Sequence, residues 1–266
     1  AKVGRRRSLP MAAASSGGAS GQRKGGALLA AGTSAAAPPL AFTFSVGGLL
    51  FTYQLGVGLE LMDRGFIVPG ETPVSGSSAG ALPEDAADRL RSGCLTVAYT
   101  RLLPVPGLVR ETQFTSRDDL FDCLRASCCW PFFLTRTPAV RCRQGIALDG
   151  YFVSPATLGC LVPTGGAQRT VAVSAFPAFA VPSLGARLER RNLIDPNMDG
   201  QFPPPPEGLP EWLGNALTSY SPARAHELLE LGRAHGRLWT ERWAEVTEPG
   251  LLLAEEQELQ ASGDAL

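Results

Sequence analysis

The sequence is poor in histidine, in paired cysteines and in long apolar runs, and each shortage excludes a class of protein. Its 266 residues include two histidines, too few for a His-rich catalytic metal centre. The six cysteines lack the paired C-x-x-C spacing of zinc sites, and we interpret them as small buried residues of a reducing compartment. No apolar run approaches the roughly 18 to 20 residues of a membrane-spanning helix, so any membrane contact is expected to be peripheral.

Charge is also nearly balanced. A formal net charge of −1 gives no basic surface to meet phosphates, so no nucleic-acid partner is expected. What the chain does have is 44% hydrophobic residues, enough for one sizeable core.

Acidic residues are missing from the first part of the chain, where the first one is Glu60. Residues 1–39 are rich in Ala, Ser, Gly and Arg and contain no aromatic side chain, which predicts a disordered leader. A basic, acid-free composition is typical of a plastid or mitochondrial transit peptide, and a plain disordered tail is the alternative. A folded domain is expected over residues 40–246, followed by an acidic tail over residues 247–266.

The apolar pattern of the folded part alternates between strands and helices, which predicts an α/β layer fold. Ser116 is expected to cap one helix, and Ser221 and Pro222 are expected to open another that reaches about Glu245. A helix is also predicted over Leu49–Arg64. Strands are predicted over Leu40–Ser45, Pro73–Ser75, Cys94–Leu102, Leu108–Phe114, Ala139–Arg143, Gly145–Leu148 and Thr170–Ala175, and an exposed loop over Pro203–Pro206.

The sequence Gly76-Ser77-Ser78-Ala79-Gly80 matches G-x-S-x-G, a pattern that places a serine nucleophile on a strained turn between strand and helix. Ser78 is therefore the candidate nucleophile. A chance match in an ordinary Gly- and Ser-rich turn is the alternative.

Ser78 needs a base, and the best candidate is Asp149, which ends an apolar strand and is followed by Gly150. Partial burial would raise its proton affinity, although Asp-Gly is also a common turn dipeptide. A hydrolase that uses His226 or His235 is the other possibility, but both histidines fall on the late helix, at predicted surface positions.

A glycine turn at Gly47 and Gly48 precedes the helix predicted over Leu49–Arg64. Free amides at this helix start could stabilise an oxyanion. An ordinary tight turn is the alternative.

Taken in this order, Phe44–Phe51, Gly76–Gly80 and Asp149-Gly150 resemble the glycine-rich loop, nucleophile elbow and Asp-Gly motif of patatin-like phospholipases. The segment Leu120–Phe133, with Ala126-Ser127 before Trp130-Pro131, resembles the stretch that precedes the aspartate in that family. The likeness is greater to the branch of neutral-lipid and triacylglycerol lipases.

The resemblance implies a three-layer α/β/α fold with a mainly parallel central sheet and a lipid acyl hydrolase without a cofactor or metal. Ser78 and Asp149 would form a catalytic dyad that works through an acyl-enzyme. Gly47, Gly48 and Leu49 would supply the oxyanion amides, and Gly76, Ser77, Ala79 and Gly80 the elbow.

The expected partners are a lipid ester and a membrane or lipid-droplet surface, and without targeting the expected location is the cytoplasm or the lipid droplet. Contact with such a surface could run through Arg224, Arg233, Arg237 and Arg242 of the late helix, or these could form a solvated face.

Three departures from the family pattern support a second hypothesis, a truncated lipid-binding or regulatory protein with impaired catalysis. Pro83 follows Leu82 where the family has a long helix, which indicates a missing segment. Val46 stands where the family has glycine and would hinder an oxyanion amide. Tyr151 stands where it has Gly or Ala, so that its ring would crowd the approach to Ser78.

Overall fold

The computed structural model describes residues 40–78, 94–133, 136–153, 155–160, 166–181, 188–202 and 208–243. The predicted leader 1–39, the Leu82-Pro83 junction, the Pro203–Pro206 loop and the tail 247–266 lie outside these residues.

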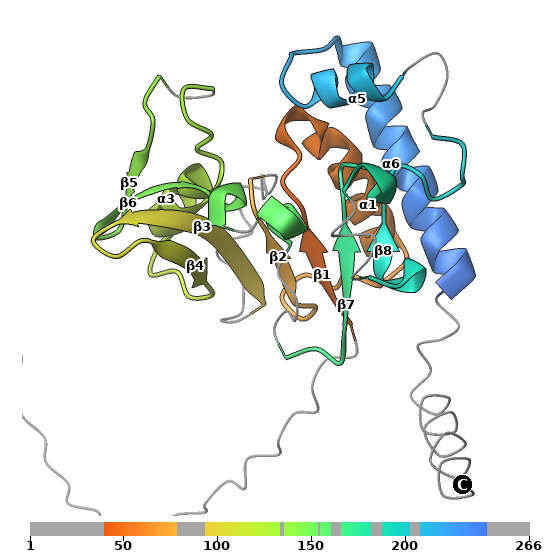
Figure 1. Ribbon diagram of the computed structural model, residues 1–266. Helices are drawn as coiled ribbons and strands as arrows, with labels where there is room; N and C mark the ends of the chain where they lie inside the picture. Colours follow the sequence, from red (N-terminus) through yellow and green to blue (C-terminus); the bar gives the residue numbers. More distant parts are fainter. Residues whose placement is uncertain are drawn as a thin grey trace, which may run out of the picture. The chain divides into compact units, whose positions relative to one another are not determined.

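A mixed, mainly parallel sheet forms the centre of the described chain, as the α/β prediction requires (Figure 1). Each strand is hydrogen-bonded to the next in the order β5-β6-β3-β2-β1-β7-β8, and β4 also pairs with β3. β2 and β6 pair with different stretches of β3. The pairings β1–β2, β1–β7, β2–β3 and β7–β8 are parallel. The strands are β1 (Leu40–Phe44), β2 (Val74–Gly76), β3 (Leu95–Leu103), β4 (Gly107–Glu111), β5 (Val140–Cys142), β6 (Gly145–Asp149), β7 (Arg169–Val173) and β8 (Leu193–Ile194).

The described helices are α1 (Phe51–Asp63), α3 (Arg117–Ser127), α5 (Leu209–Asn215) and α6 (Pro222–Trp243). A short 3-10 helix, η1 (Gly48–Leu50), leads into α1. The predicted cap of α3 is confirmed, because the hydroxyl of Ser116 accepts a hydrogen bond from the amide of Asp119. Sequence patterning missed β8 and α5, which are too short to show a period.

The larger core lies where α1 and α6 pack against β1, β7 and β8, and Figure 1 shows α6 running alongside α1. Glycines bring the two helices together: a Cβ at Gly56 would lie 2.0 Å from the carbonyl oxygen of Leu229, and one at Gly232 would lie 2.0 Å from that of Tyr53. The fully buried Trp212 and Trp239 fill this core. A smaller core joins α3 to β3, β5 and β6.

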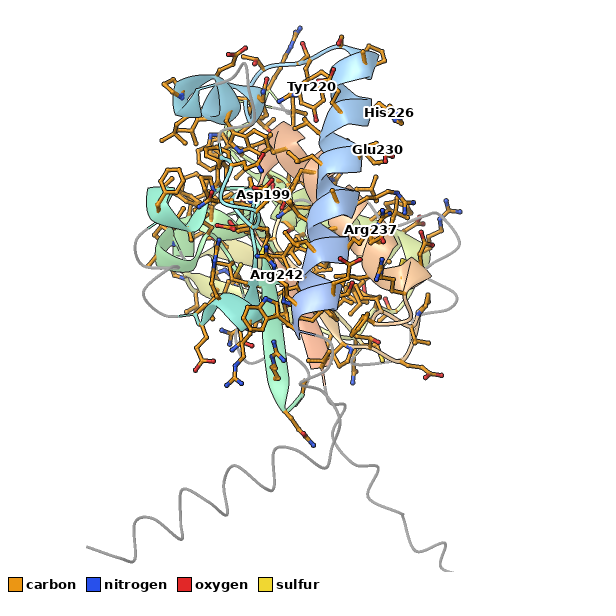
Figure 2. The ribbon with its side chains drawn as sticks, turned by 90° about the vertical axis from the view of Figure 1, so that its right-hand side faces the viewer. Asp199, Tyr220, His226, Glu230, Arg237 and Arg242 are labelled. Carbon is orange, nitrogen blue, oxygen red and sulfur yellow. The ribbon has the colours of Figure 1, made fainter. Side chains whose placement is uncertain are left out.

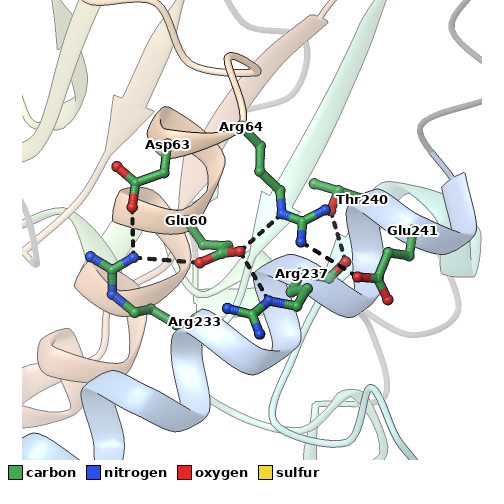
Figure 3. A network of polar contacts seen from close by, with 7 residues as sticks. All are labelled: Glu60, Asp63, Arg64, Arg233, Arg237, Thr240 and Glu241. Carbon is green, nitrogen blue, oxygen red and sulfur yellow. Dashed lines mark hydrogen bonds and ion pairs between the residues drawn. The ribbon is translucent and has the colours of Figure 1, made fainter.

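An ion-pair network fastens the same two helices at Glu60 (Figure 3). Its carboxylate contacts Arg64, Arg233 and Arg237 at 2.9, 3.4 and 3.2 Å. Burial raises the pKa of Glu60, but the hydrogen bonds from Arg64 and Arg237 outweigh burial and hold that pKa below its ordinary value. Two arginines expected at a lipid surface, Arg233 and Arg237, therefore pair with Glu60, while their side chains stay 26% and 56% exposed.

The other two arginines also have partners within the chain. Arg224 pairs with Glu227, and Arg242 donates to the carbonyl oxygen of Met198. All four arginine side chains keep some exposure to solvent, so contact with a lipid surface stays a prediction. Figure 2 shows His226, Glu230, Arg237 and Arg242 along α6, and all four of these residues are exposed.

Candidate active site

The strands β2 and β6 meet end to end along one edge of β3. β2 runs parallel to β3, and its last residue, Gly76, pairs with Val97. β6 runs antiparallel to β3, and its last residue, Asp149, pairs with Tyr99. Because β4 occupies the opposite edge of β3 at both Val97 and Tyr99, β2 and β6 must share the remaining edge and run toward each other. Their carboxyl ends, which carry Ser78 and Asp149, therefore converge.

The backbone of Ser78 has the left-handed conformation, with φ of 68°. This conformation is rare for a residue with a side chain and is typical of a nucleophile on a tight turn. Its neighbour Ser77 is buried and donates a hydrogen bond to the carbonyl oxygen of Gly159 at 3.1 Å. A Cβ at either Gly150 or Gly159 would lie 2.7 Å from the Ser77 hydroxyl oxygen. The glycine after Asp149 thus lets β6 approach the elbow.

Asp149 is buried at the end of β6, and its backbone is held on both sides. Its amide donates to the carbonyl oxygen of Cys129 at 3.0 Å, and the Thr100 hydroxyl donates to its carbonyl oxygen at 2.7 Å. The carboxylate accepts a hydrogen bond from the amide of Tyr151 at 2.9 Å. Burial raises the pKa of Asp149 to about 6, although the Tyr151 amide and the nearby Ser78 side chain act in the opposite direction.

Of the three residues expected to supply oxyanion amides, Gly47 and Gly48 line a cavity with amides that have no acceptor in the described part of the chain. Gly48 has φ of +52°, and a Cβ there would lie 2.2 Å from the carbonyl oxygen of Ala216. The amide of Leu49, however, donates to the carbonyl oxygen of Ala216 at 2.9 Å, so the expectation for Leu49 is wrong. The amide of Val46 is likewise engaged, by Leu158 at 2.8 Å.

Buried polar contacts hold the loop in place from below. Gln54 of α1 donates to the carbonyl oxygen of Ser45 at 2.9 Å and to that of Val173 at 3.2 Å. The Ser45 hydroxyl in turn accepts from the amide of Ala175 at 3.1 Å. The loop between β1 and η1 is therefore fastened to both α1 and β7.

The cavity has a volume of about 710 Å³, and Gly47, Gly48, Ser78 and Asp149 lie together in its wall. Most of its wall is apolar and comes from segments far apart in the chain, namely Leu124, Trp130, Phe133, Phe176, Val181 and Leu213. Tyr151, which is expected to lie near Ser78, lines the same cavity. Its ring centroid is 5.3 Å from that of Trp130. The volume falls in the range of small-molecule binding sites.

Neither histidine lines this cavity. His226 is exposed on α6 (Figure 2). His235 is buried, against the expectation of a surface position, and its Nδ1 lies 3.0 Å from the Tyr53 hydroxyl. Burial lowers the pKa of His235, so it is a neutral part of the core. A triad with either histidine at Ser78 is therefore wrong.

Two contacts of Ser78 have no signal in the sequence: its amide donates to the Ser127 hydroxyl at 2.9 Å, and its carbonyl oxygen accepts from the Cys128 thiol. The family resemblance marks Ser127 only as part of the segment before the aspartate, and Cys128 looks like the other cysteines. Of the predicted elbow, Gly76, Ser77 and Ser78 are described, whereas Ala79 and Gly80 lie outside the described residues.

Comparison with known proteins gives no match, neither to a family model nor to a curated protein. Within the described ranges, no helix combines the length and the apolar character that would let it cross a membrane. The chemistry of this chain must therefore be inferred from Ser78, Asp149 and the cavity that they line.

Proposed function

We propose that this protein is a lipid acyl hydrolase of the patatin-like type, with the three-layer α/β/α arrangement of that family. It would cleave carboxylic esters of the triacylglycerol or phospholipid kind. The observation that carries the proposal is the placement of Ser78 and the buried Asp149 together in the wall of a largely apolar cavity, at the converging ends of β2 and β6. A nucleophile and a base within hydrogen-bond reach are the minimum for covalent acyl transfer.

The reaction follows from the positions of these groups. The Ser78 oxygen attacks the acyl carbonyl carbon while its proton passes to the Asp149 carboxylate. The amides of Gly47 and Gly48 would donate to the oxyanion that forms, at the start of η1 and α1 where the helix dipole also favours negative charge. Collapse of this intermediate releases the alcohol, which takes the proton from Asp149. Water then attacks the acyl-enzyme, Asp149 accepts its proton, and the fatty acid leaves as Ser78 regains a proton.

The raised pKa of Asp149 suits this role. A carboxylate with a pKa of about 6 is mostly ionised at pH 7, yet holds a proton far better than an ordinary aspartate. The alcohol proton therefore moves to a stronger base without a histidine.

The cavity wall supports a lipid substrate. Phe121, Leu213 and Leu217 line the cavity and are also exposed, by 41%, 41% and 57%. Apolar side chains that continue from a cavity to the surface suit an acyl chain that enters from a membrane or lipid-droplet surface.

A lipid-binding protein without turnover is the second candidate. It is favoured by the loss of the Leu49 and Val46 amides to acceptors within the fold, which leaves a smaller oxyanion site. The cavity would bind acyl chains equally well in this case.

Labelling with a fluorophosphonate probe, followed by mass spectrometry of the modified peptide, separates the two candidates. Modification at Ser78, its loss in Ser78→Ala and hydrolysis of lipid esters by the wild type are the results expected for the hydrolase. Ser221→Ala, which changes an exposed serine at the start of α6, should be labelled like the wild type. Displacement of a fluorescent fatty acid without labelling or hydrolysis would establish the binding protein instead.

A further inference from the structure

The C-terminal turn of α3 contacts the backbone of both members of the dyad. The hydroxyl of Ser127 accepts a hydrogen bond from the amide of Ser78 at 2.9 Å. The thiol of Cys128 donates to the carbonyl oxygen of the same residue. The carbonyl oxygen of Cys129 accepts from the amide of Asp149 at 3.0 Å. Three consecutive residues thus bind three backbone groups that belong to Ser78 and Asp149.

The C-terminal turn of α3 is itself anchored to β3, the strand with which both β2 and β6 pair. Ser127 is 2% exposed and donates its own proton to the carbonyl oxygen of Ala98 at 2.6 Å. Ala98 lies in β3 between Val97, which pairs with β2, and Tyr99, which pairs with β6. The Ser127 hydroxyl therefore has both its donor and an acceptor site engaged, and its position is fixed at the point where β2 and β6 converge.

Ser78 needs such a support for two reasons. Its left-handed backbone is unfavourable for a serine, and it persists only when surrounding contacts hold it. The strand before it, β2, is three residues long, so the ladder alone gives little restraint.

We infer that residues 127–129, here termed the α3 clamp, are positioning residues that hold the Ser78 backbone against Asp149 and so set the geometry of the dyad. This inference rests on the proposed function for its catalytic consequence. The clamp itself is a structural feature that can be measured in the absence of catalysis.

Ser127→Ala and Cys128→Ala test the catalytic consequence. Each removes one contact to Ser78 and should lower kcat, and the rate constant of fluorophosphonate labelling, by about tenfold, while KM changes by less than about twofold. Cys128→Ser keeps a donor for the Ser78 carbonyl and should recover most of the rate. The double variant should lose about 100-fold if the two contacts act independently.

Two matched variants separate positioning from stability. Ser116→Ala removes the cap of the same helix, and Cys94→Ala removes a thiol that donates to the carbonyl oxygen of Gly70 at 3.2 Å, away from the cavity. Both should keep the wild-type kcat when all proteins are assayed well below their unfolding temperatures. Equal losses in these variants, or an unchanged kcat in Ser127→Ala, would overturn the catalytic part of the inference.

Native-state amide exchange followed by NMR tests the clamp without reference to catalysis. The Ser78 amide should exchange about tenfold faster in Ser127→Ala than in Ser116→Ala. If the wild type is neither labelled nor active but this difference is found, the clamp stands and the proposed hydrolase fails. If the wild type is active and the exchange is the same in both variants, the clamp is refuted and the hydrolase stands.

Discussion

Replacing Asp149 by Asn should make the protein more stable at neutral pH while it abolishes catalysis. Burial raises the pKa of this carboxyl from 3.8 to about 6, so the folded state holds its proton more tightly than the unfolded chain does. A difference of roughly two pKa units corresponds to about 3 kcal/mol of lost stability once the carboxyl is ionised. An Asn side chain removes this penalty and still has an oxygen to accept from the Tyr151 amide.

The sign of the pH dependence distinguishes this cause from others. Between about pH 4 and pH 6 the unfolded chain has released the proton and the folded chain has not, so the wild type loses stability as pH rises through this window. Above about pH 6 the loss is complete. The stability gain of Asp149→Asn should therefore be close to zero near pH 3, about 1 kcal/mol near pH 4.5 and about 2 to 3 kcal/mol at pH 7.5.

Urea unfolding of both proteins at several pH values measures this difference. Asp122→Asn is the control, because Asp122 is a half-exposed partner of Arg125, and its effect should stay below about 0.5 kcal/mol. A gain for Asp149→Asn that is absent at pH 7.5, or that does not grow with pH, would refute the burial explanation. In the wild type, kcat/KM should fall about tenfold from pH 7 to pH 5, since only ionised Asp149 can act as the base.

Three further substitutions test the cavity and the packing beneath it. Tyr151→Ala should widen the cavity and so raise kcat/KM for branched-chain nitrophenyl esters relative to straight-chain esters. An unchanged ratio of the two kcat/KM values would show that Tyr151 does not limit the size of the substrate. Gly232→Ala should lower the free energy of unfolding by about 2 kcal/mol or more, because the new Cβ would lie 2.0 Å from the carbonyl oxygen of Tyr53. Gly214→Ala is the control: its Cβ would meet no atom within 4 Å, so it should cost nothing when both variants are unfolded in urea. Glu60→Gln should cost about 2 kcal/mol at pH 7 and much less in acid, once the pH has fallen below the lowered pKa of Glu60 and the wild-type carboxyl is protonated. A loss independent of pH would contradict the ion-pair interpretation.

Much of the fold was predictable from local patterns. The strands β1, β6 and β7 are short segments with mainly apolar and β-favouring residues, and the Ser116 and Pro222 starts of α3 and α6 carry residues typical of helix N-termini. Gly65, with φ of +77°, ends the region of α1 as expected. These features depend on neighbours in the sequence, which is why one sequence suffices to find them.

The candidate site was predictable in its residues but not in its assembly. Ser78 and Asp149 were identifiable from short motifs, whereas their approach depends on β2 and β6 sharing one edge of β3. The use of the Leu49 amide by Ala216 is equally invisible in sequence, because the two residues are brought together by the packing of α5. Long-range pairing of this kind has no local signal.

The position of the dyad explains why its support must come from α3. The large core of β1, β7, α1 and α6 restrains the glycine loop, while Asp149 ends β6, a strand whose Ala147 belongs to the smaller core around α3. Ser78 lies at the boundary between the two cores, two residues after the end of the three-residue strand β2. A left-handed serine and a buried carboxylate both raise the free energy of the folded state, so contacts from α3 must offset them at this boundary. Loss of those contacts should therefore reduce the rate of reaction before it unfolds the chain.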